Sequence, residues 1–159
     1  MANEVYLTRE GFNKLQSQLE HLKVKERQKI AKAIGEARAQ GDISENAEYD
    51  AAKDAQAHCE SRIAELEAKL ANVRIIEDQN IASDKVLIGA LVSLKDVKSG
   101  EQMKYLMVSP EEASYEESKI SIFSPIGKGL LGHKVGESVE IKVPAGILHY
   151  KILKIERPL

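Results

Sequence analysis

Two carboxylates three residues apart, Asp42 and Glu45, are the side chains of this sequence best suited to metal chemistry. Carboxylate oxygens are the ligands that Mg²⁺ prefers, but Mg²⁺ requires octahedral oxygen coordination and retains its waters, so two carboxylates hold it only weakly. Such a pair would complete a site if another macromolecule supplied further acids and phosphate oxygens. A metal ion held in this way could activate water for hydrolysis of a phosphodiester.

The same two acids also fit a purely structural role. An acid followed three residues later by Glu, ahead of a helix, resembles a capping box, and Glu48 would favour the positive end of that helix. On spacing alone the capping interpretation is favoured, although one carboxylate oxygen can cap while another points outward. We expect Ser44 to act as a cap, and Asn46 either to cap the helix or to orient the acids.

Long helices are predicted on both sides of the acidic pair, because residues 8–74 contain no Pro and only three Gly. On each side, seam residues follow one another in steps of three and four, as in a coiled coil. On the second side the seam residues are Tyr49, Ala52, Gln56, Cys59, Ile63, Leu66, Leu70 and Val73. On the first side they are Phe12, Leu15, Leu19, Leu22, Glu26, Ile30, Ala33 and Ala37. Thr8 is the predicted N-cap of the first helix.

The two seams predict one antiparallel hairpin. If the chain reverses near residue 43, Ala37 faces Tyr49 and Phe12 faces Val73, with the intervening seam positions paired in order. Gly41 suits the position after a helix C-terminus, where a left-handed backbone costs Gly little. Each arm of about 30 residues would reach roughly 45 Å, so the turn that carries Asp42 and Glu45 must project.

Composition limits the classes of function. The net charge of −2 over 159 residues, with no strongly basic half, does not favour a protein that binds nucleic acid without help. Cys59 is the only cysteine, which excludes an intrachain disulfide and a cysteine metal cluster. Neither a signal peptide nor a membrane-spanning stretch is evident. We therefore expect a cytoplasmic protein with no membrane partner.

The second half follows a different pattern and predicts a small mixed domain. Short β-branched runs separated by turn residues predict five strands, and Pro125–Leu131 predicts one short helix. The predicted strands are Val86–Leu94, Met103–Val108, Lys119–Phe123, Ser138–Val143 and Ile147–Ile155. The fold class is therefore α+β. The expected division is a coiled-coil domain over 1–78 with its tip near 41–46, a linker over 79–84 and a sheet domain over 85–159.

Several motifs resemble the Gre family of bacterial transcript-cleavage factors. The run from Gly41 to Tyr49, followed by Ala51-Ala52-Lys53, is similar to the tip signature of that family. Ile34–Arg38 and Cys59–Ile63 match on either side of the tip, and Ser124–Gly132 resembles a motif of the family's FKBP-like C-terminal domain. The resemblance extends over essentially the whole chain.

The resemblance implies a factor that works on RNA polymerase. The coiled coil would enter the secondary channel of the polymerase, where Asp42 and Glu45 help the polymerase's own acids retain a second Mg²⁺. The polymerase would then cleave the 3′ end of backtracked nascent RNA. On this view the chain has no nuclease activity of its own, binds no cofactor tightly and is a monomer.

The resemblance also suggests contact residues, each with a plainer alternative. Arg38, Asn46, Tyr49 and Lys53 would face the RNA or the channel. However, Tyr49 fits a role in bracing the seam equally well, and lone surface bases are commonly only solvated. Residues 123–125, Phe123, Ser124 and Pro125, would contact the rim of the polymerase. Family members often have a polar residue at 123, so Phe123 departs from the pattern, and its alternative role is to end a core-facing strand.

Two other functions remain open at the level of sequence. A regulator that occupies the same channel could inhibit the polymerase without promoting cleavage, although the intact Asp42 and Glu45 pair argues against this. A coiled-coil scaffold could dimerise through its seam, but an intramolecular hairpin already buries that seam. An isomerase, despite the FKBP-like resemblance, is disfavoured because the domain has few aromatic residues to line a pocket.

Overall fold

The first arm of the predicted hairpin is helical throughout. The computed structural model describes residues 4–41 and 46–159. In it, α1 (Arg9–His21), a π-helical turn η1 (Leu22–Glu26) and α2 (Arg27–Ala39) follow one another without a break. The Gly11 N–H donates to Thr8 Oγ1 over 3.0 Å, which confirms Thr8 as the cap of α1.

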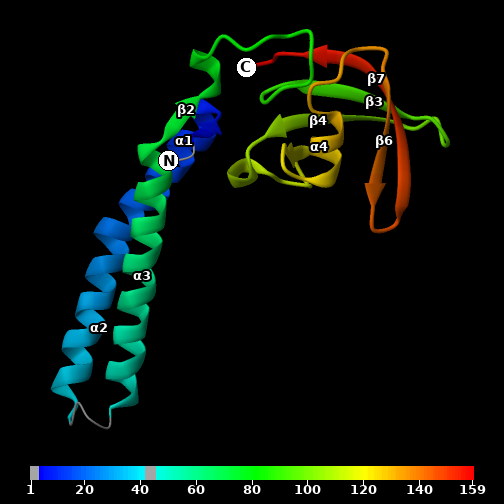
Figure 1. The fold of residues 1–159 in the computed structure, drawn as a ribbon. Coiled ribbons are helices and arrows are strands. Elements are labelled where there is room, and N and C mark those ends of the chain that lie inside the picture. Colours follow the sequence, from blue (N-terminus) through cyan, green and yellow to red (C-terminus); the bar gives the residue numbers. More distant parts are fainter. Residues whose placement is uncertain (1–3, 42–45) are drawn as a thin grey trace. The chain divides into compact units, whose positions relative to one another are not determined.

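The second arm is the single helix α3 (Ala47–Ala71), which runs antiparallel beside α2 (Figure 1). Its predicted seam is confirmed by side chains that are buried or half-buried at all eight positions: Tyr49, Ala52, Gln56, Cys59, Ile63, Leu66, Leu70 and Val73. The prediction is wrong only in placing Val73 within the helix. The helix stops at Ala71, and Val73 begins a short strand instead.

The seam of the first arm differs from the prediction at one position. Ala33 is exposed, whereas its neighbour Ile34 is buried at 9 % exposure. The predicted step of three from Ile30 to Ala33 fails here, because Leu22, Glu26, Ile30 and Ile34 follow one another in steps of four. A π turn accommodates one extra residue within a helix, so η1 lets this run of long steps stay on the inner face.

Contacts across the hairpin surround the π turn. The carbonyl of Leu22 accepts the Arg27 N–H and also the thiol of Cys59, whose sulfur lies 3.9 Å away. The guanidinium of Arg27 forms two 2.8 Å hydrogen bonds with the carboxylate of Glu60 on the other arm. Cys59 is therefore a small buried residue of the seam, as predicted, and its thiol helps to satisfy an irregular backbone.

The second half of the chain forms a five-stranded sheet in the order β5-β4-β3-β7-β6. Its strands are β3 (Leu91–Asp96), β4 (Gln102–Val108), β5 (Lys119–Ser121), β6 (Ser138–Val143) and β7 (Gly146–Glu156). The β4–β5 pair is parallel and the other pairs are antiparallel. All five predicted strands and the short helix α4 (Pro125–Leu130) are present, which confirms the α+β class.

One face of the sheet holds the core of this half. Leu94, Met107 and Ile152 are fully buried there, and α4 adds Leu130 to the same cluster. Gly129 allows α4 to lie close to β6, since a Cβ at that position would come within 2.6 Å of the Ile141 side chain. The packing of α4 therefore fixes the segment 123–125 that leads into it.

A parallel strand pair was not predicted. β1 (Val5–Leu7) pairs with β2 (Val73–Ile75), so the chain enters the first arm and leaves the second through bonded strands. By mutual contact these strands cluster with the sheet, and residues 12–72 form a separate compact unit. Within the sheet unit, the Glu112 carboxylate accepts the Thr8 N–H over 2.8 Å and also the Thr8 hydroxyl.

The Arg27–Glu60 pair predicts an acid-sensitive hairpin. Its hydrogen bond with Arg27 holds the pKa of Glu60 below the usual value of 4.5. A carboxylate with a depressed folded-state pKa stabilises the fold above its unfolded pKa, and this contribution is lost as the pH falls through the folded pKa. Glu60→Gln should therefore lower the Tm of the hairpin at neutral pH, and the difference from wild type should shrink below pH 4.5.

Circular dichroism melting curves recorded from neutral pH to about pH 3 test this linkage. Glu20→Gln, which removes an exposed carboxylate elsewhere on the first arm, serves as the control. A Tm difference between Glu60→Gln and wild type that stays constant over the whole pH range would contradict the assignment.

Candidate functional site

The described backbone on the first-arm side of the tip ends as the sequence predicts. α2 ends at Ala39, and the Gln40 N–H donates to the Ala37 carbonyl over 3.3 Å. Gly41 follows with φ = +145°, a conformation that residues with a Cβ rarely adopt. The prediction that Gly41 follows the end of a helix and needs its conformational freedom is confirmed.

On the second-arm side, Asn46 is the cap of α3. Its Oδ1 accepts the backbone N–H groups of Glu48 and Tyr49 over 3.0 and 3.1 Å, so it satisfies two of the free donors at the helix start. This confirms the expectation that Asn46 can cap the helix. The capping expectations for Ser44 and for the pair Asp42 and Glu45 fall on residues outside the described ranges.

The same Asn46 side chain also reaches the other arm. Its Nδ2 donates to the Ala37 carbonyl over 2.5 Å, and this carbonyl already accepts the Gln40 N–H. One amide thus bonds the last turn of α2 and the first turn of α3. The type and position of Asn46 could reveal the cap from sequence. The bond to Ala37 could not be predicted, because it depends on how closely the two arms approach.

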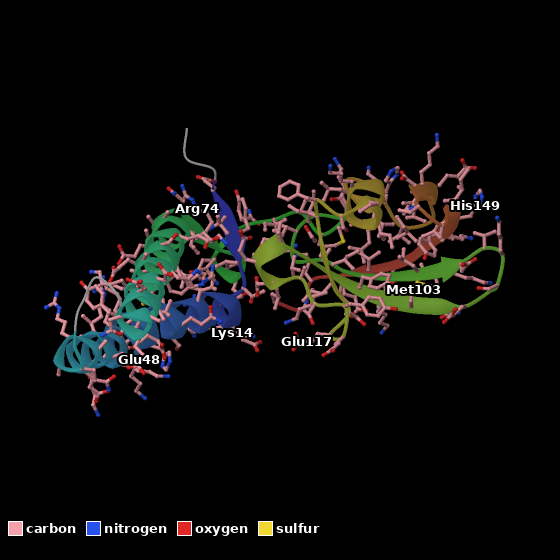
Figure 2. The ribbon with its side chains drawn as sticks, turned by 90° about the horizontal axis from the view of Figure 1, so that it is seen from below. Lys14, Glu48, Arg74, Met103, Glu117 and His149 are labelled. Carbon is pink, nitrogen blue, oxygen red and sulfur yellow. The ribbon has the colours of Figure 1, made fainter. Side chains whose placement is uncertain are left out.

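The predicted metal ligands Asp42 and Glu45 lie outside the described residues. Their nearest described acidic neighbours, Glu48 and Asp50, are exposed in the first turn of α3, and Glu48 projects from the tip end of the hairpin (Figure 2). Within residues 4–41 and 46–159, no three His, Cys, Asp or Glu side chains are grouped as metal ligands would be. A magnesium role for the tip therefore depends on the two acids and on a partner.

Three of the predicted contact residues lie close to the tip on both arms. The guanidinium carbon of Arg38 lies 5.9 Å from the centre of the Tyr49 ring, a cation–π distance. Tyr49 itself is half-buried, as its alternative role in the seam requires. Lys53 is exposed and donates to Gln56 on its own helix over 2.8 Å. The structure thus brings Arg38 and Tyr49 together and leaves the Lys53 ammonium at the surface.

The predicted rim segment is an ordered corner of the sheet unit. β5 ends at Ser121, and the Phe123 side chain is 64 % exposed, so Phe123 does not end a core-facing strand. Ser124 caps α4 by accepting the Gly127 N–H over 3.0 Å, and its hydroxyl donates to the Ser121 carbonyl over 2.6 Å. Pro125 occupies the first helical turn, where its missing N–H costs nothing.

A shallow, mostly apolar groove of about 360 Å³ lies beside this corner. Tyr115, Pro125 and Ile126 are among its lining residues, and the Tyr115 side chain is 90 % exposed. Lys119 also lines the groove, and its ammonium pairs with the Glu117 carboxylate over 3.0 Å, which raises the pKa of Lys119. The groove thus combines apolar surface with an ion pair.

Comparison with known proteins extends these observations to a family. The family profile "Transcription elongation factor, N-terminal" matches residues 5–75, and "Transcription elongation factor, GreA/GreB, C-term" matches residues 81–157. The chain belongs to the GreA/GreB family of transcription elongation factors. The resemblance inferred from the tip and from the Ser124–Gly132 motif is thereby confirmed.

Full-length relatives support the assignment of this GreA/GreB-family chain. It is 51 % identical to the transcription elongation factor GreA of Chloroherpeton thalassium over 98 % of its own length and 99 % of the relative. It is 47 % identical to the factor of the same name from Christiangramia forsetii, over 99 % of each chain. Both relatives therefore match this chain from end to end.

Similar solved structures carry related names. The transcription factor Gfh1 is 35 % identical and aligns over 98 % of this chain and 99 % of its own, with a TM-score of 0.46. The GreA factor homolog 1 of Thermus thermophilus is 34 % identical and aligns over 97 % and 99 %, with a TM-score of 0.44. These scores are low, so the family assignment rests on the sequence matches.

No helix in the described parts of this chain is long and apolar enough to cross a membrane.

The close approach of Gly127 to the backbone of Ser121 at the rim corner is a constraint that can be tested. A Cβ on Gly127 would lie 2.0 Å from the Ser121 carbonyl oxygen, which is backbone and cannot move aside easily. Gly127→Ala should therefore destabilise the sheet unit by about 1–3 kcal/mol, as overpacking typically does. Urea unfolding followed by the amide NMR signals of each unit measures the effect.

Gly35→Ala is the matched control, because nothing lies within 4 Å of a Cβ at that position in α2. There the same change should stabilise the hairpin by about 0.5–1 kcal/mol, since Ala loses less backbone entropy than Gly in a helix. A Gly127→Ala protein as stable as wild type would show that the close approach to Ser121 is not a constraint.

Proposed function

We propose that this chain stimulates RNA polymerase to cleave the 3′ end of backtracked nascent RNA and so rescues arrested elongation complexes. The observation that carries the proposal is the cap at Asn46, which begins α3 after the acidic pair. The start of α3 therefore has a cap of its own, and we infer that Asp42 and Glu45 serve chemistry at the end of the hairpin. Membership of the elongation-factor family supports the same role.

The chemistry of the donor set requires a partner with acids of its own. Carboxylates fit Mg²⁺, but two of them leave most of its octahedral positions unfilled. We infer that the active-site acids of the polymerase and the RNA phosphate supply the remaining ligands. An ion shared in this way would provide charge that activates the attacking water and offsets charge developing at the phosphate. Asp42 and Glu45 would help to hold the metal ion and to orient the attacking water. The catalytic centre would be that of the polymerase.

The hairpin has the reach that this role needs. Residues 9–39 are helical throughout, and at 1.5 Å rise per residue they extend roughly 45 Å. Near the tip the seam includes two small residues, Ala37 and Ala52, which are buried at 2 % and 9 % exposure and let the two helices approach closely there. We infer that this finger enters through the secondary channel of the polymerase.

The sheet unit would supply affinity from outside the channel. Phe123 offers an exposed aromatic ring beside Ser124 and Pro125, whose backbone is held by the cap of α4. Large apolar anchors on a rigid backbone contribute strongly to protein interfaces, because little conformational entropy is lost when they bind. We infer that residues 123–125 contact the polymerase rim and that the factor acts as a monomer without nuclease activity of its own.

Removal of either tip acid should abolish cleavage without loss of binding. Asp42→Ala and Glu45→Ala are each expected to lower the rate of RNA shortening in a stalled, backtracked complex by at least about 100-fold at saturating factor. The double variant should be little worse than either single, because the two acids act as one unit. The assay follows end-labelled RNA in the presence of Mg²⁺, and competition with labelled wild-type factor measures binding.

Asp54→Ala, which removes an exposed carboxylate one turn further along α3 than Asp50, is the control and should cleave normally. Undiminished cleavage by both tip variants would refute the proposal. If wild-type factor shortens no RNA but slows nucleotide addition, the chain is instead an inhibitor that occupies the channel.

Replacement of the exposed aromatic at the rim corner should affect binding alone. Phe123→Ala is expected to raise the factor concentration for half-maximal cleavage by about 10-fold or more, as loss of an aromatic anchor does, with no change in the rate at saturation. Val97→Ala, which trims another exposed apolar side chain of the same unit, should leave both values unchanged. Equal effects of the two variants would remove Phe123 from the interface.

A further inference from the structure

We propose that Asn46 is a positioning residue for the cleavage reaction, and that it acts by tying together the two helix ends between which Asp42 and Glu45 lie. The inference rests on the proposed function of those two acids. It differs from the sequence-based expectation that Asn46 contacts RNA or the channel. Here the Asn46 side chain acts through the backbone of both arms.

The bonding of Asn46 requires an amide. Oδ1 accepts two N–H groups from the first turn of α3, while Nδ2 donates to the Ala37 carbonyl on α2. Asp would provide acceptors only, and the hydroxyl of Ser is too short to cap one helix and reach the other. Asn is therefore the one short side chain that performs both tasks with the geometry observed.

The Ala37 carbonyl, to which Asn46 donates, belongs to a buried residue in the last turn of α2. Ala37 is 2 % exposed, and its carbonyl accepts both the Gln40 N–H and the Asn46 amide, so both of its lone pairs are used. The guanidinium of Arg38, the next residue, lies over the ring of Tyr49, whose N–H bonds to Asn46. The two arms are thus locked at the level of residues 37 and 46.

The order of residues along the chain gives this lock a functional meaning. Asp42 directly follows Gly41 at the end of the first arm, and Glu45 directly precedes Asn46 at the start of the second. Each acid is therefore attached to a different helix end. We infer that a bond between the two helix ends restrains the short segment that joins them and carries both acids. A displacement of about 1 Å at a reacting centre can cost 100-fold in rate.

Asn46→Ser separates the two tasks of the side chain. Ser is as good a helix cap as Asn, so α3 should keep its start, while the bond to Ala37 is lost. We expect cleavage at saturating factor to fall about 10- to 100-fold, and the Mg²⁺ concentration for half-maximal cleavage to rise. Polymerase affinity and helix content should stay at wild-type values.

The matched control is Asn72→Ser at the opposite end of α3. There the Asn amide donates to the Ala68 carbonyl of its own helix over 3.3 Å, so the same chemical change removes a bond that does not join the arms. This variant should cleave at the wild-type rate with the wild-type Mg²⁺ requirement. If in both variants the loss of cleavage rate is proportional to the decrease in Tm, Asn46 has a stabilising role only and the proposal is wrong.

A double-mutant test distinguishes positioning from direct contact. In a factor that carries Asp42→Ala and Glu45→Ala, the further change Asn46→Ser should leave the residual rate unchanged, because no acids remain to be positioned. An additional loss in that background, or a full cleavage rate for Asn46→Ser alone, would overturn the inference. If Asn46→Ser unfolds, Asn46→Asp keeps the cap while losing the bond to Ala37, and full cleavage by that variant would overturn the inference equally.

The proposed function itself is tested by other arms of the same assay. Absence of RNA shortening with wild-type factor, or normal shortening with both acid variants, indicates that the cleavage role is wrong. Normal wild-type cleavage that is sensitive to the acids but insensitive to Asn46→Ser indicates that only the positioning role is wrong.

Discussion

Two helices that pack face to face each bury one stripe, and the hairpin of this protein is organised by that constraint. The seam residues of each arm must therefore stay on the face that meets the other arm. The π turn follows from this demand, since the run of four-residue steps from Leu22 to Ile34 would otherwise carry the seam around the first arm. The Cys59 thiol and the Arg27–Glu60 pair then satisfy the groups around that irregular turn.

Much of this architecture could be predicted because it depends on local periodicity. The seven buried or half-buried positions of α3 follow from steps of three and four residues, and all five strands of the sheet follow from short β-branched runs separated by turn residues. The sequence could not show that Ile34, rather than Ala33, occupies the buried seam position. A π turn changes the helical repeat, and no distinctive residue type marks it. The β1–β2 pair was missed because each strand has three residues and pairs in parallel across the length of the hairpin.

The candidate site shows the same division between local and tertiary information. Residue chemistry and the tip signature indicated Asp42 and Glu45, and the family match supports the role of the chain in transcription elongation. Spacing alone suggested that these acids cap a helix, whereas the cap seen at the start of α3 is Asn46. The second bond of Asn46, 2.5 Å from Nδ2 to the Ala37 carbonyl oxygen, depends on how closely the two arms approach each other. Residue spacing along one arm does not contain that information.

The strand pair at the base has a consequence for how the hairpin loses structure. β1 directly precedes the first arm and β2 directly follows the second, so the outer ends of both arms are bonded, as are the inner ends through Asn46. Helices normally fray from their termini, where backbone opening is easiest. Because the arms are bonded to each other at both ends, a fluctuation that separates them has to begin as a local opening between the ends. The π turn, where the spacing of the backbone hydrogen bonds changes from four to five residues, is the place where we expect amide exchange with solvent to start.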